Sequence, residues 1–218
     1  MATKTTKKQE RVDEILVRLK RMYPKASCTL DFTTPFELLI ATMLSAQSTD
    51  ARVNIVTKSL FRKYPDPPAF ANATQAEMER DVRQTGFFRN KAKAVIAASK
   101  AIVEKHGGEV PRTMEELTAL PGVGRKTANV VLSNAFDTPV GIVVDTHVTR
   151  VSGRLGLTSN VDAEKIEQDL MKLVPTKEWT RFSHRMILHG RQICIARKPK
   201  CAECDLNELC PSAMEDRL

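Results

Sequence analysis

"ALPGVGRKTANVVL", residues 119–132, places a proline and two glycines directly ahead of a basic, helix-forming run. A helix is expected before it, because Thr113 and Glu116 have the spacing of a capping box, in which each side chain bonds the other's backbone N–H. Pro121 ends that helix near Leu120, and a second helix begins at Arg125. The stretch therefore predicts two helices joined by a tight hairpin.

The hairpin has the features of a phosphate site. Gly122 and Gly124 permit backbone angles closed to other residues, and they let the main chain approach a ligand closely. The N–H groups at the start of the second helix then point outward towards an anion. The alternative is an ordinary helix–helix turn, which would be favoured if Pro-Gly-x-Gly were the only signal.

The rest of the chain predicts an all-α protein. Apolar residues recur at helical spacing in "QERVDEILVRLKRMY", "FELLIATMLSAQ" and "NKAKAVIAASKAIVEKHG", and prolines cut the chain into many short helices. The best strand candidate is "TPVGIVVD", residues 138–145, which is short enough to be an extended connector. Composition shifts there, which indicates a domain boundary. The helix before Cys28 can pack with either half.

Charge favours a polyanionic partner. The 218 residues include 34 Lys and Arg against 26 Asp and Glu, a net charge of +8, although basic proteins that bind no nucleic acid are also common. The N-terminus lacks the apolar stretch of a secretory signal, so we expect a cytoplasmic protein. The apolar run 36–46 is shorter than the roughly 18 residues of a membrane span. We expect no membrane association.

Four of the five cysteines lie within 17 residues, in "CIARKPKCAECDLNELC", and predict a metal site. The ligand candidates are Cys194, Cys201, Cys204 and Cys210, with the spacing Cys-x6-Cys-x2-Cys-x5-Cys. Thiolates this close are costly unless a cation neutralises them. One closely spaced Cys-x2-Cys pair, with longer spacers to the two outer cysteines, favours an iron–sulfur cluster slightly over zinc. Cys28 stands alone and is most simply a buried small residue.

The segment "VVDTHVTRVSGRLG", residues 143–156, sets Asp145 where it can cap a helix starting at Thr146. A plain N-cap is the commoner role of an aspartate at such a boundary. A carboxylate that also faces a reaction centre is the alternative, and the two roles are compatible.

These segments together resemble the helix–hairpin–helix DNA glycosylase superfamily. "LPGVGRKTA", with its lysine, "VDTH" and the cysteine spacing are similar to those of the endonuclease III branch, and the resemblance covers about residues 11–211. It implies an all-α helix-hairpin-helix glycosylase fold of two helical domains with a DNA cleft between them. A helical barrel would span 28–138, and residues 1–27 plus 139–218 would form the cluster domain.

The resemblance implies a bifunctional enzyme of base excision repair, a DNA N-glycosylase and abasic-site lyase for oxidised pyrimidines. Its partner would be duplex DNA that contains oxidised bases or abasic sites, and we expect it to act as a monomer, in the nucleoid if bacterial. Lys126 would attack the sugar C1′ and form a Schiff base, and Asp145 would stabilise the developing charge. The attack needs a neutral amine, whereas an unperturbed lysine, of pKa ~10.4, is almost wholly protonated at pH 7. By itself, a lysine in the first turn of a helix is far more often merely solvated.

The resemblance also implies which residues contact DNA. A base inside a duplex must be flipped out, and Gln47 in "LSAQSTD" would fill the gap while Phe87 in "TGFFRNKA" would wedge the opposite strand. Otherwise, Gln47 caps a helix end and Phe87 with Phe88 belongs to the core. Gly122 and Gly124 would hold the DNA backbone. His147 contacts either DNA or only the turn.

For the cysteines, the resemblance implies a [4Fe-4S] cluster with a structural task. It would fix the loop "IARKPK" so that Arg197, Lys198 and Lys200 meet phosphates; the alternative is a solvated basic loop. Two rival functions remain. A monofunctional adenine glycosylase of the same superfamily would lack the hairpin lysine and carry a glutamate where this chain has Ala41. A non-catalytic DNA-binding module would use the hairpin and a zinc-held loop.

Overall fold

The computed structural model describes residues 4–215, with side chains from residue 7 to residue 213. The α-helices are α1 (Lys4–Met22), α2 (Pro35–Leu44), α3 (Asp50–Lys63), α4 (Pro67–Ala71), α5 (Gln75–Asp81), α6 (Phe88–His106), α7 (Met114–Thr118), α8 (Arg125–Ala135), α9 (Thr146–Arg154), α10 (Ala163–Leu173), α11 (Trp179–Gln192) and α12 (Pro211–Glu215). Four short 3-10 helices are η1 (Arg83–Thr85), η2 (Thr176–Glu178), η3 (Cys201–Glu203) and η4 (Asn207–Leu209). The predicted all-α class is confirmed, because no strand occurs in residues 4–215 and the segment 138–145 is an irregular connector.

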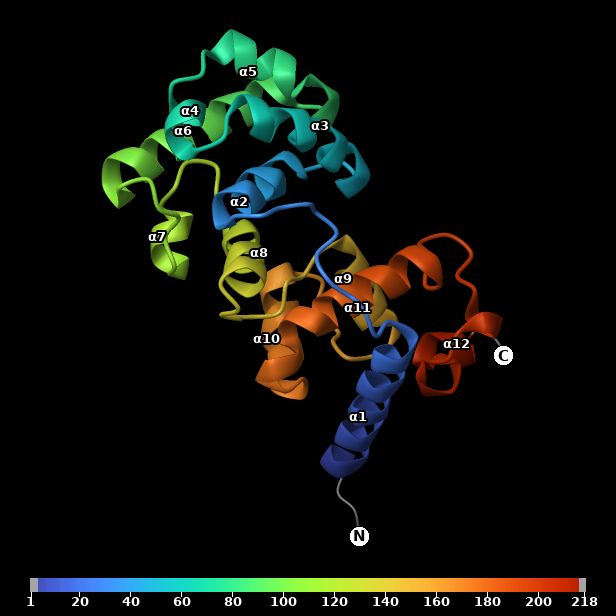
Figure 1. The fold of residues 1–218 in the computed structure, drawn as a ribbon. Helices are drawn as coiled ribbons and strands as arrows, with labels where there is room; N and C mark the ends of the chain where they lie inside the picture. The colour runs from blue at the N-terminus through green and yellow to red at the C-terminus, as the bar shows by residue number, and fades with distance from the viewer. Residues whose placement is uncertain (1–3, 216–218) are drawn as a thin grey trace. The chain divides into compact units, whose positions relative to one another are not determined.

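The chain divides into two compact units, residues 28–140 and residues 1–27 with 141–218. Figure 1 shows the helices of each unit, with α2 to α8 in the first and α1 with α9 to α12 in the second. The outermost three residues at each end of the chain fall outside the described range. Within that range, no helix is both long and apolar enough to cross a bilayer.

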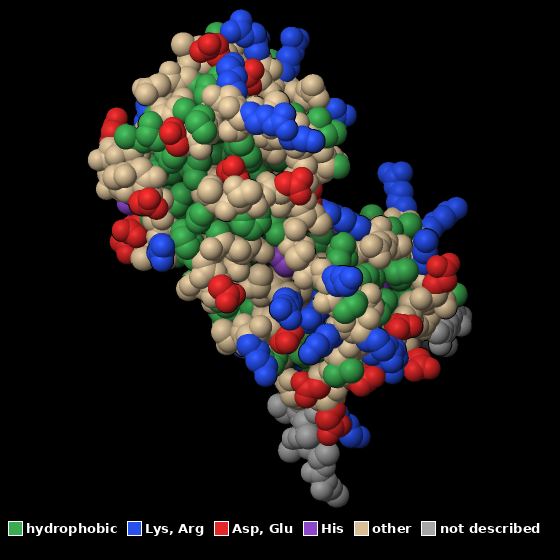
Figure 2. All heavy atoms as spheres, in the orientation of Figure 1, with side chains coloured by type: hydrophobic (Ala, Val, Ile, Leu, Met, Phe, Trp, Pro, Cys, Tyr) green, Lys and Arg blue, Asp and Glu red, His purple; other side chains and the backbone are tan. Residues whose placement is uncertain are grey.

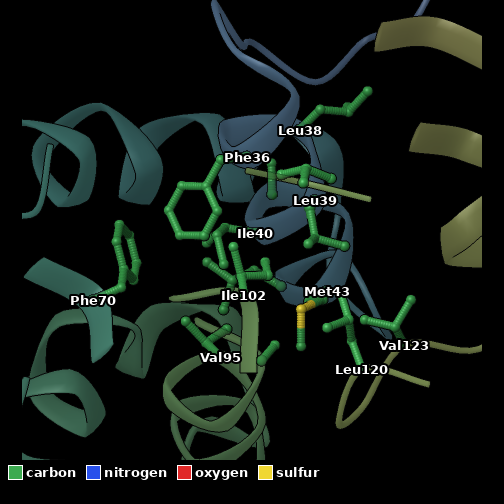
Figure 3. Packing of buried hydrophobic residues seen from close by; sticks show 14 of the residues in the cluster. Phe36, Leu38, Leu39, Ile40, Met43, Phe70, Val95, Ile102, Leu120 and Val123 are labelled. Carbon is green, nitrogen blue, oxygen red and sulfur yellow. The ribbon is translucent and has the colours of Figure 1, made fainter. Parts of the chain in front are cut away.

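Helix α2 is the centre of the 28–140 unit. Its run PFELLIATML is apolar nearly all round, a pattern typical of a helix buried on every side. Leu38, Leu39 and Ile40 are each 0% exposed, and Figure 3 shows Ile40 near Ile102 and Val95 of α6. Full burial of one such side chain contributes about 1.5–3 kcal/mol, so α2 is firmly held up to its end at Leu44.

The second unit is built around α1. Its helical stripe of Val12, Ile15 and Leu19 is buried in one cluster with apolar residues of α9, α10 and α11. Periodicity alone left the partner of this helix open, whereas the resemblance implied that it joins residues 139–218; the structure packs it against α11. The first helix therefore belongs with residues 141–218, in the unit that carries Asp145 and the four-cysteine segment.

Candidate functional site

The predicted hairpin joins α7 to α8. Thr113 caps α7, since its Oγ1 accepts a hydrogen bond from the Glu116 N–H at 3.2 Å. The reciprocal half of the predicted capping box differs: the Glu116 carboxylate accepts from the Thr113 hydroxyl at 2.7 Å and not from its backbone N–H. Helix α7 ends at Thr118, two residues before the expected end at Leu120.

The two hairpin glycines have different backbone angles and surroundings. Gly122 has φ +75°, and a Cβ there would lie 2.8 Å from the Ala94 Cβ of α6. Gly124 has φ −94° and ψ 171°, extended backbone that any residue adopts, and no atom lies within 4 Å of a Cβ built on it. The prediction of angles closed to other residues is therefore right for Gly122 and wrong for Gly124. At Gly124 the missing side chain leaves open space.

That open space lies at the start of α8. Gly124 is the N-cap residue and makes no side-chain capping bond to the first turn, so no cap side chain competes for the amides there. Lys126 is the second residue of the helix, and its side chain is exposed. An anion can approach these amides closely, because both the hydrogen-bond donors and the positive end of the helix dipole face the open position.

Asp145 caps α9, as its place in the sequence predicts. Its Oδ1 accepts hydrogen bonds from the backbone N–H groups of His147 and Val148, both at 2.8 Å. Within the described part of the chain, the second oxygen, Oδ2, has no hydrogen-bond partner. The side chain is half-buried. One oxygen therefore starts the helix, and the other makes no hydrogen bond within the described residues.

His147 lies in the first turn of α9. Its Nδ1 is 3.1 Å from the Arg150 Nη2. Because a guanidinium can only donate, Nδ1 accepts this bond, and a neutral His147 ring carries its proton on Nε2. The ring also packs closely against α11, where a Cβ on Gly190 would lie 3.0 Å from the His147 Cβ.

Gln47 and Phe87 share an unusual backbone conformation. Both are left-handed, with φ +53° and φ +48°, which costs a non-glycine residue about 1–2 kcal/mol. Phe87 is 63% exposed, whereas Phe88 packs against the core, so the core alternative holds for Phe88 only. Gln47 is exposed and caps neither neighbouring helix; Ser45 is the C-cap of α2, and Thr49 is the N-cap of α3.

A pocket of about 270 Å³ brings Gln47, Phe87 and Gly122 together. Its remaining lining residues are Met43, Ala46, Asn90, Lys91 and Ala94. Figure 3 shows Met43 of α2 near Leu120 and Val123 of the hairpin. Three candidates drawn from distant stretches of the 28–140 unit thus line one surface.

The four clustered cysteines line a second cavity, of about 300 Å³, in the other unit. All four are half-buried, and no group of three or more His, Cys, Asp or Glu in the described range is spaced for a single metal ion. Burial, with a smaller effect of the other three cysteines, raises the pKa of the Cys204 thiol to about 11. Burial likewise raises the pKa of Cys210. A set of thiols grouped in this way forms thiolates readily only beside a cation.

Arginines of α9 fix the first part of the cysteine segment. Arg154 Nη1 lies 3.4 Å from the Cys194 Sγ and donates to the Ile195 carbonyl at 2.8 Å. Arg150 Nε donates to the Cys194 carbonyl at 3.1 Å. The helix that Asp145 caps therefore also holds the first cysteine of the segment.

A buried tyrosine and histidine support a second cysteine. The Tyr23 hydroxyl is 3.1 Å from the His189 Nδ1, and the Nε2 of His189 is 3.6 Å from the Cys204 Sγ. Burial lowers the pKa of His189 to about 4 and raises that of Tyr23 to about 12. At pH 7 the neutral hydroxyl can therefore donate to Nδ1, which leaves the Nε2–H directed at the sulfur.

The basic loop is exposed where the sequence places it. Arg197, Lys198 and Lys200 are all exposed, and none forms an ion pair among the described residues. Lys200 N–H bonds the Ile193 carbonyl at 3.0 Å, which closes the loop at its base. Figure 2 shows Lys and Arg side chains spread over the visible face with Asp and Glu between them.

Sequence reasoning missed several of these supporting residues. Arg150 and Arg154 are four apart on α9, a spacing that places two cations on one helix face and is visible in "THVTRVSGR". Tyr23 and His189 carried no such signal, because their contact joins residues that are 166 positions apart in the sequence. Lys91 is another buried residue that sequence reasoning missed.

Comparison with known proteins agrees with this geometry. A family model described as "HhH-GPD superfamily base excision DNA repair protein" matches residues 40–176. "Endonuclease III" of Synechocystis sp. is 56% identical over 96% of both chains. The solved "Structure of a non-covalent Endonuclease III-DNA Complex" has a TM-score of 0.91 at 45% identity and covers 100% of this chain and 99% of that one. A second solved structure, "Structure of a Trapped Endonuclease III-DNA Covalent Intermediate: Estranged-Adenine Complex", has a TM-score of 0.91 at 44% identity and covers 100% of this chain and 100% of that one.

The family model spans more than half of the chain, and the match to the relative from Synechocystis reaches nearly end to end. The chain belongs to the HhH-GPD superfamily of base excision DNA repair proteins, and within it to the endonuclease III family.

Proposed function

We infer that the chain is a DNA glycosylase of base excision repair with an associated abasic-site lyase, and that it acts on oxidised pyrimidines in duplex DNA. Two separate observations carry the chemistry: Lys126 is exposed at the start of α8, and the Asp145 Oδ2 has no partner in the described part of the chain. The solved relative trapped as a covalent intermediate with DNA supports a covalent route.

In this proposal, the Lys126 amine forms a bond to the sugar C1′ while the bond from C1′ to the damaged base breaks. The base leaves with a proton, and the ring opens to a Schiff base between Nζ and C1′. Loss of a C2′ proton then expels the 3′-phosphate by β-elimination, and water releases the lysine. The Asp145 Oδ2 stabilises the positive charge that develops on the sugar and moves protons in these steps.

The hairpin would hold the DNA backbone beside this lysine. Gly122 supplies the left-handed turn and the close approach to α6, and Gly124 leaves room at the first amides of α8. The amides that would bind a phosphate are adjacent in sequence to Lys126. The turn that holds the DNA backbone therefore also positions the Lys126 amine.

Gln47 and Phe87 would open the duplex. An extruded nucleotide leaves a gap in the stack, and side chains must occupy it to keep the neighbouring bases apart. Gln47 is the candidate for the vacated space and Phe87 for the wedge in the opposite strand; both are exposed and line one pocket. His147, held by Arg150, would contact the backbone from the other unit.

Cys194, Cys201, Cys204 and Cys210 would hold a [4Fe-4S] cluster, which fits a cavity lined by all four sulfurs. When bound, the cluster neutralises the thiolates and rigidifies the segment; base release and β-elimination transfer no net electrons. The loop between the first two ligands would then present Arg197, Lys198 and Lys200 to phosphates. We place the activity on chromosomal DNA in the cytoplasm or nucleoid, carried out by a monomer.

A lesion panel tests the proposal. Duplexes that each contain one oxidised pyrimidine, one oxidised purine or an A·G mismatch are assayed separately for base release and strand cleavage, with wild-type protein, K126A and the control K93A. Lys93 is also an exposed lysine of the 28–140 unit, but it lies on α6. We expect both activities on oxidised pyrimidines, their loss in K126A and retention in K93A. Release of adenine alone, without cleavage, would instead indicate the adenine-glycosylase rival, although the position of its glutamate is held here by the fully buried Ala41.

A further inference from the structure

Lys91 of α6 is a buried cation without a carboxylate. The residue is only 7% exposed, and its Nζ donates to the Leu44 carbonyl at 2.8 Å and the Thr85 carbonyl at 2.7 Å. No ion pair involves it among the described residues. Burial lowers the pKa of Lys91, because the charged ammonium loses hydration when it is removed from water. Lysines are almost never buried unless paired, so these two carbonyl bonds are the reason it is there.

The two carbonyls belong to the segments that carry the duplex-opening candidates. Leu44 is the last residue of α2, and Gln47 follows three positions later. Thr85 is the last residue of η1, and Phe87 follows two positions later. The segments are some 40 positions apart in the sequence, and the ammonium bridges them.

Both segments need such support. Gln47 and Phe87 each occupy the left-handed region, which persists at non-glycine residues only where the surroundings hold it. The carbonyl at a helix end has no partner inside its own helix, so an outside donor fixes the direction in which the chain leaves. Lys91 provides this donor to both segments and lines the same pocket as the two side chains.

We propose that Lys91 is a positioning residue that holds the Gln47 segment and the Phe87 segment together. The Gln47 and Phe87 side chains then enter the duplex at a fixed separation from each other. This inference rests on the proposed function. An ammonium suits the task because it offers several donors from one atom at the end of a long arm, which lets it bond carbonyls of two separate segments. A thioether of similar length would fill the space and leave both carbonyls unsatisfied.

The test compares a substrate that must be opened with one that need not be. The first is a duplex with a single oxidised pyrimidine, assayed for base release under single-turnover conditions. The second is a single strand with one abasic site, assayed for β-elimination. We expect K91M to slow the duplex reaction about tenfold and to leave the single-strand reaction within about twofold. K91Q, whose amide still donates, should lie between K91M and wild type.

The matched control is S99A. Ser99 is also buried in α6, but its Oγ bonds only the Val95 carbonyl of its own helix. S99A therefore removes a buried hydrogen bond from the same helix without touching either segment, and we expect it to leave both substrates unaffected. If K91M does not fold, K91Q carries the same comparison.

A double-mutant cycle asks whether Lys91 acts through the two side chains. Adding K91M to Q47A/F87A should cost far less in duplex rate than K91M costs in the wild type. Equal losses on both substrates, no loss on the duplex, or full additivity in the cycle would overturn the proposal. Wild-type protein that is inactive on both substrates would instead refute the proposed function, so the two failures are distinguishable.

Discussion

Asp145 divides two tasks between the two oxygens of one carboxylate. Oδ1 starts α9 through two backbone bonds, and Oδ2 is the oxygen proposed to face the sugar. Asparagine is as good an N-cap as aspartate but carries no charge, whereas alanine can do neither task. We therefore expect D145N to melt close to wild type and D145A to lose about 1 kcal/mol of stability.

Both variants should lose base release by about a hundredfold or more, because neither carries the negative charge. Thermal melting and single-turnover assays of the two proteins separate the capping role from the chemical one. Base release by D145N at the wild-type rate would show that the carboxylate serves only as a cap.

The two hairpin glycines should respond differently to the same substitution. G122A places a Cβ 2.8 Å from the Ala94 Cβ at φ +75°, so we expect a loss of about 1–3 kcal/mol of stability. G124A meets no atom within 4 Å and an ordinary backbone angle, so its stability should stay within about 0.5 kcal/mol of wild type.

The new methyl group of G124A would, however, stand where the phosphate is proposed to approach. We expect weaker binding of duplex DNA, measured by fluorescence anisotropy, without a change in melting temperature. Unchanged affinity in G124A would place the phosphate elsewhere.

For single residues, the sequence predicted contacts with near neighbours in the chain but not contacts with residues far away in the sequence. The cap at Asp145 and the left-handed Gly122 depend on neighbours within a few positions, and both were predicted. The bonds of Lys91 depend on two carbonyls that only the packing of α2, η1 and α6 brings together. Gly124 shows that a glycine in a turn motif need not have a positive φ, because its backbone is extended and no atom lies within 4 Å of a Cβ built there.

Helix α9 connects the proposed chemistry to the proposed cluster. Asp145 caps it at one end, and Arg154, its last residue, bonds the cysteine segment at Cys194, Ile195 and Ala196. R154A leaves these acceptors without a donor, so we expect less iron and acid-labile sulfide per chain and a weaker broad absorbance in the visible region.

R181A is the control for this variant, since Arg181 is exposed on α11, and its cluster content should match wild type. Full iron content in R154A would show that the cysteines bind their metal without help from α9. A colourless wild-type protein that contains zinc would contradict the cluster itself.

The prediction of the elements was accurate in type and less so in detail. Apolar periodicity predicted helices in the stretches that form α1, α2 and α6, and the segment 138–145 is a connector, as its length allowed. Helix α7 ends two residues earlier than expected. The second half of its capping box also differed, because the Glu116 carboxylate is satisfied by the Thr113 hydroxyl. Such choices between nearby donors depend on side-chain geometry that a spacing rule does not contain.

In the whole molecule, the residues proposed to carry out one reaction come from two different units. Lys126 belongs to the 28–140 unit, and Asp145 and the four clustered cysteines belong to the other. The class and the family follow from motifs spread over both units. The unit that α1 joins was predicted only from the family resemblance, because an amphipathic stripe shows that a helix is buried but not which core it joins.

The central claim is that Lys126 forms the covalent bond to DNA. Its most direct test is to trap the wild-type protein with borohydride on a duplex that contains one abasic site, digest the adduct and identify the modified residue by mass spectrometry. We expect a single sugar adduct on Lys126, and no trapped complex with K126A. An adduct on another residue, or undiminished trapping in K126A, would contradict it.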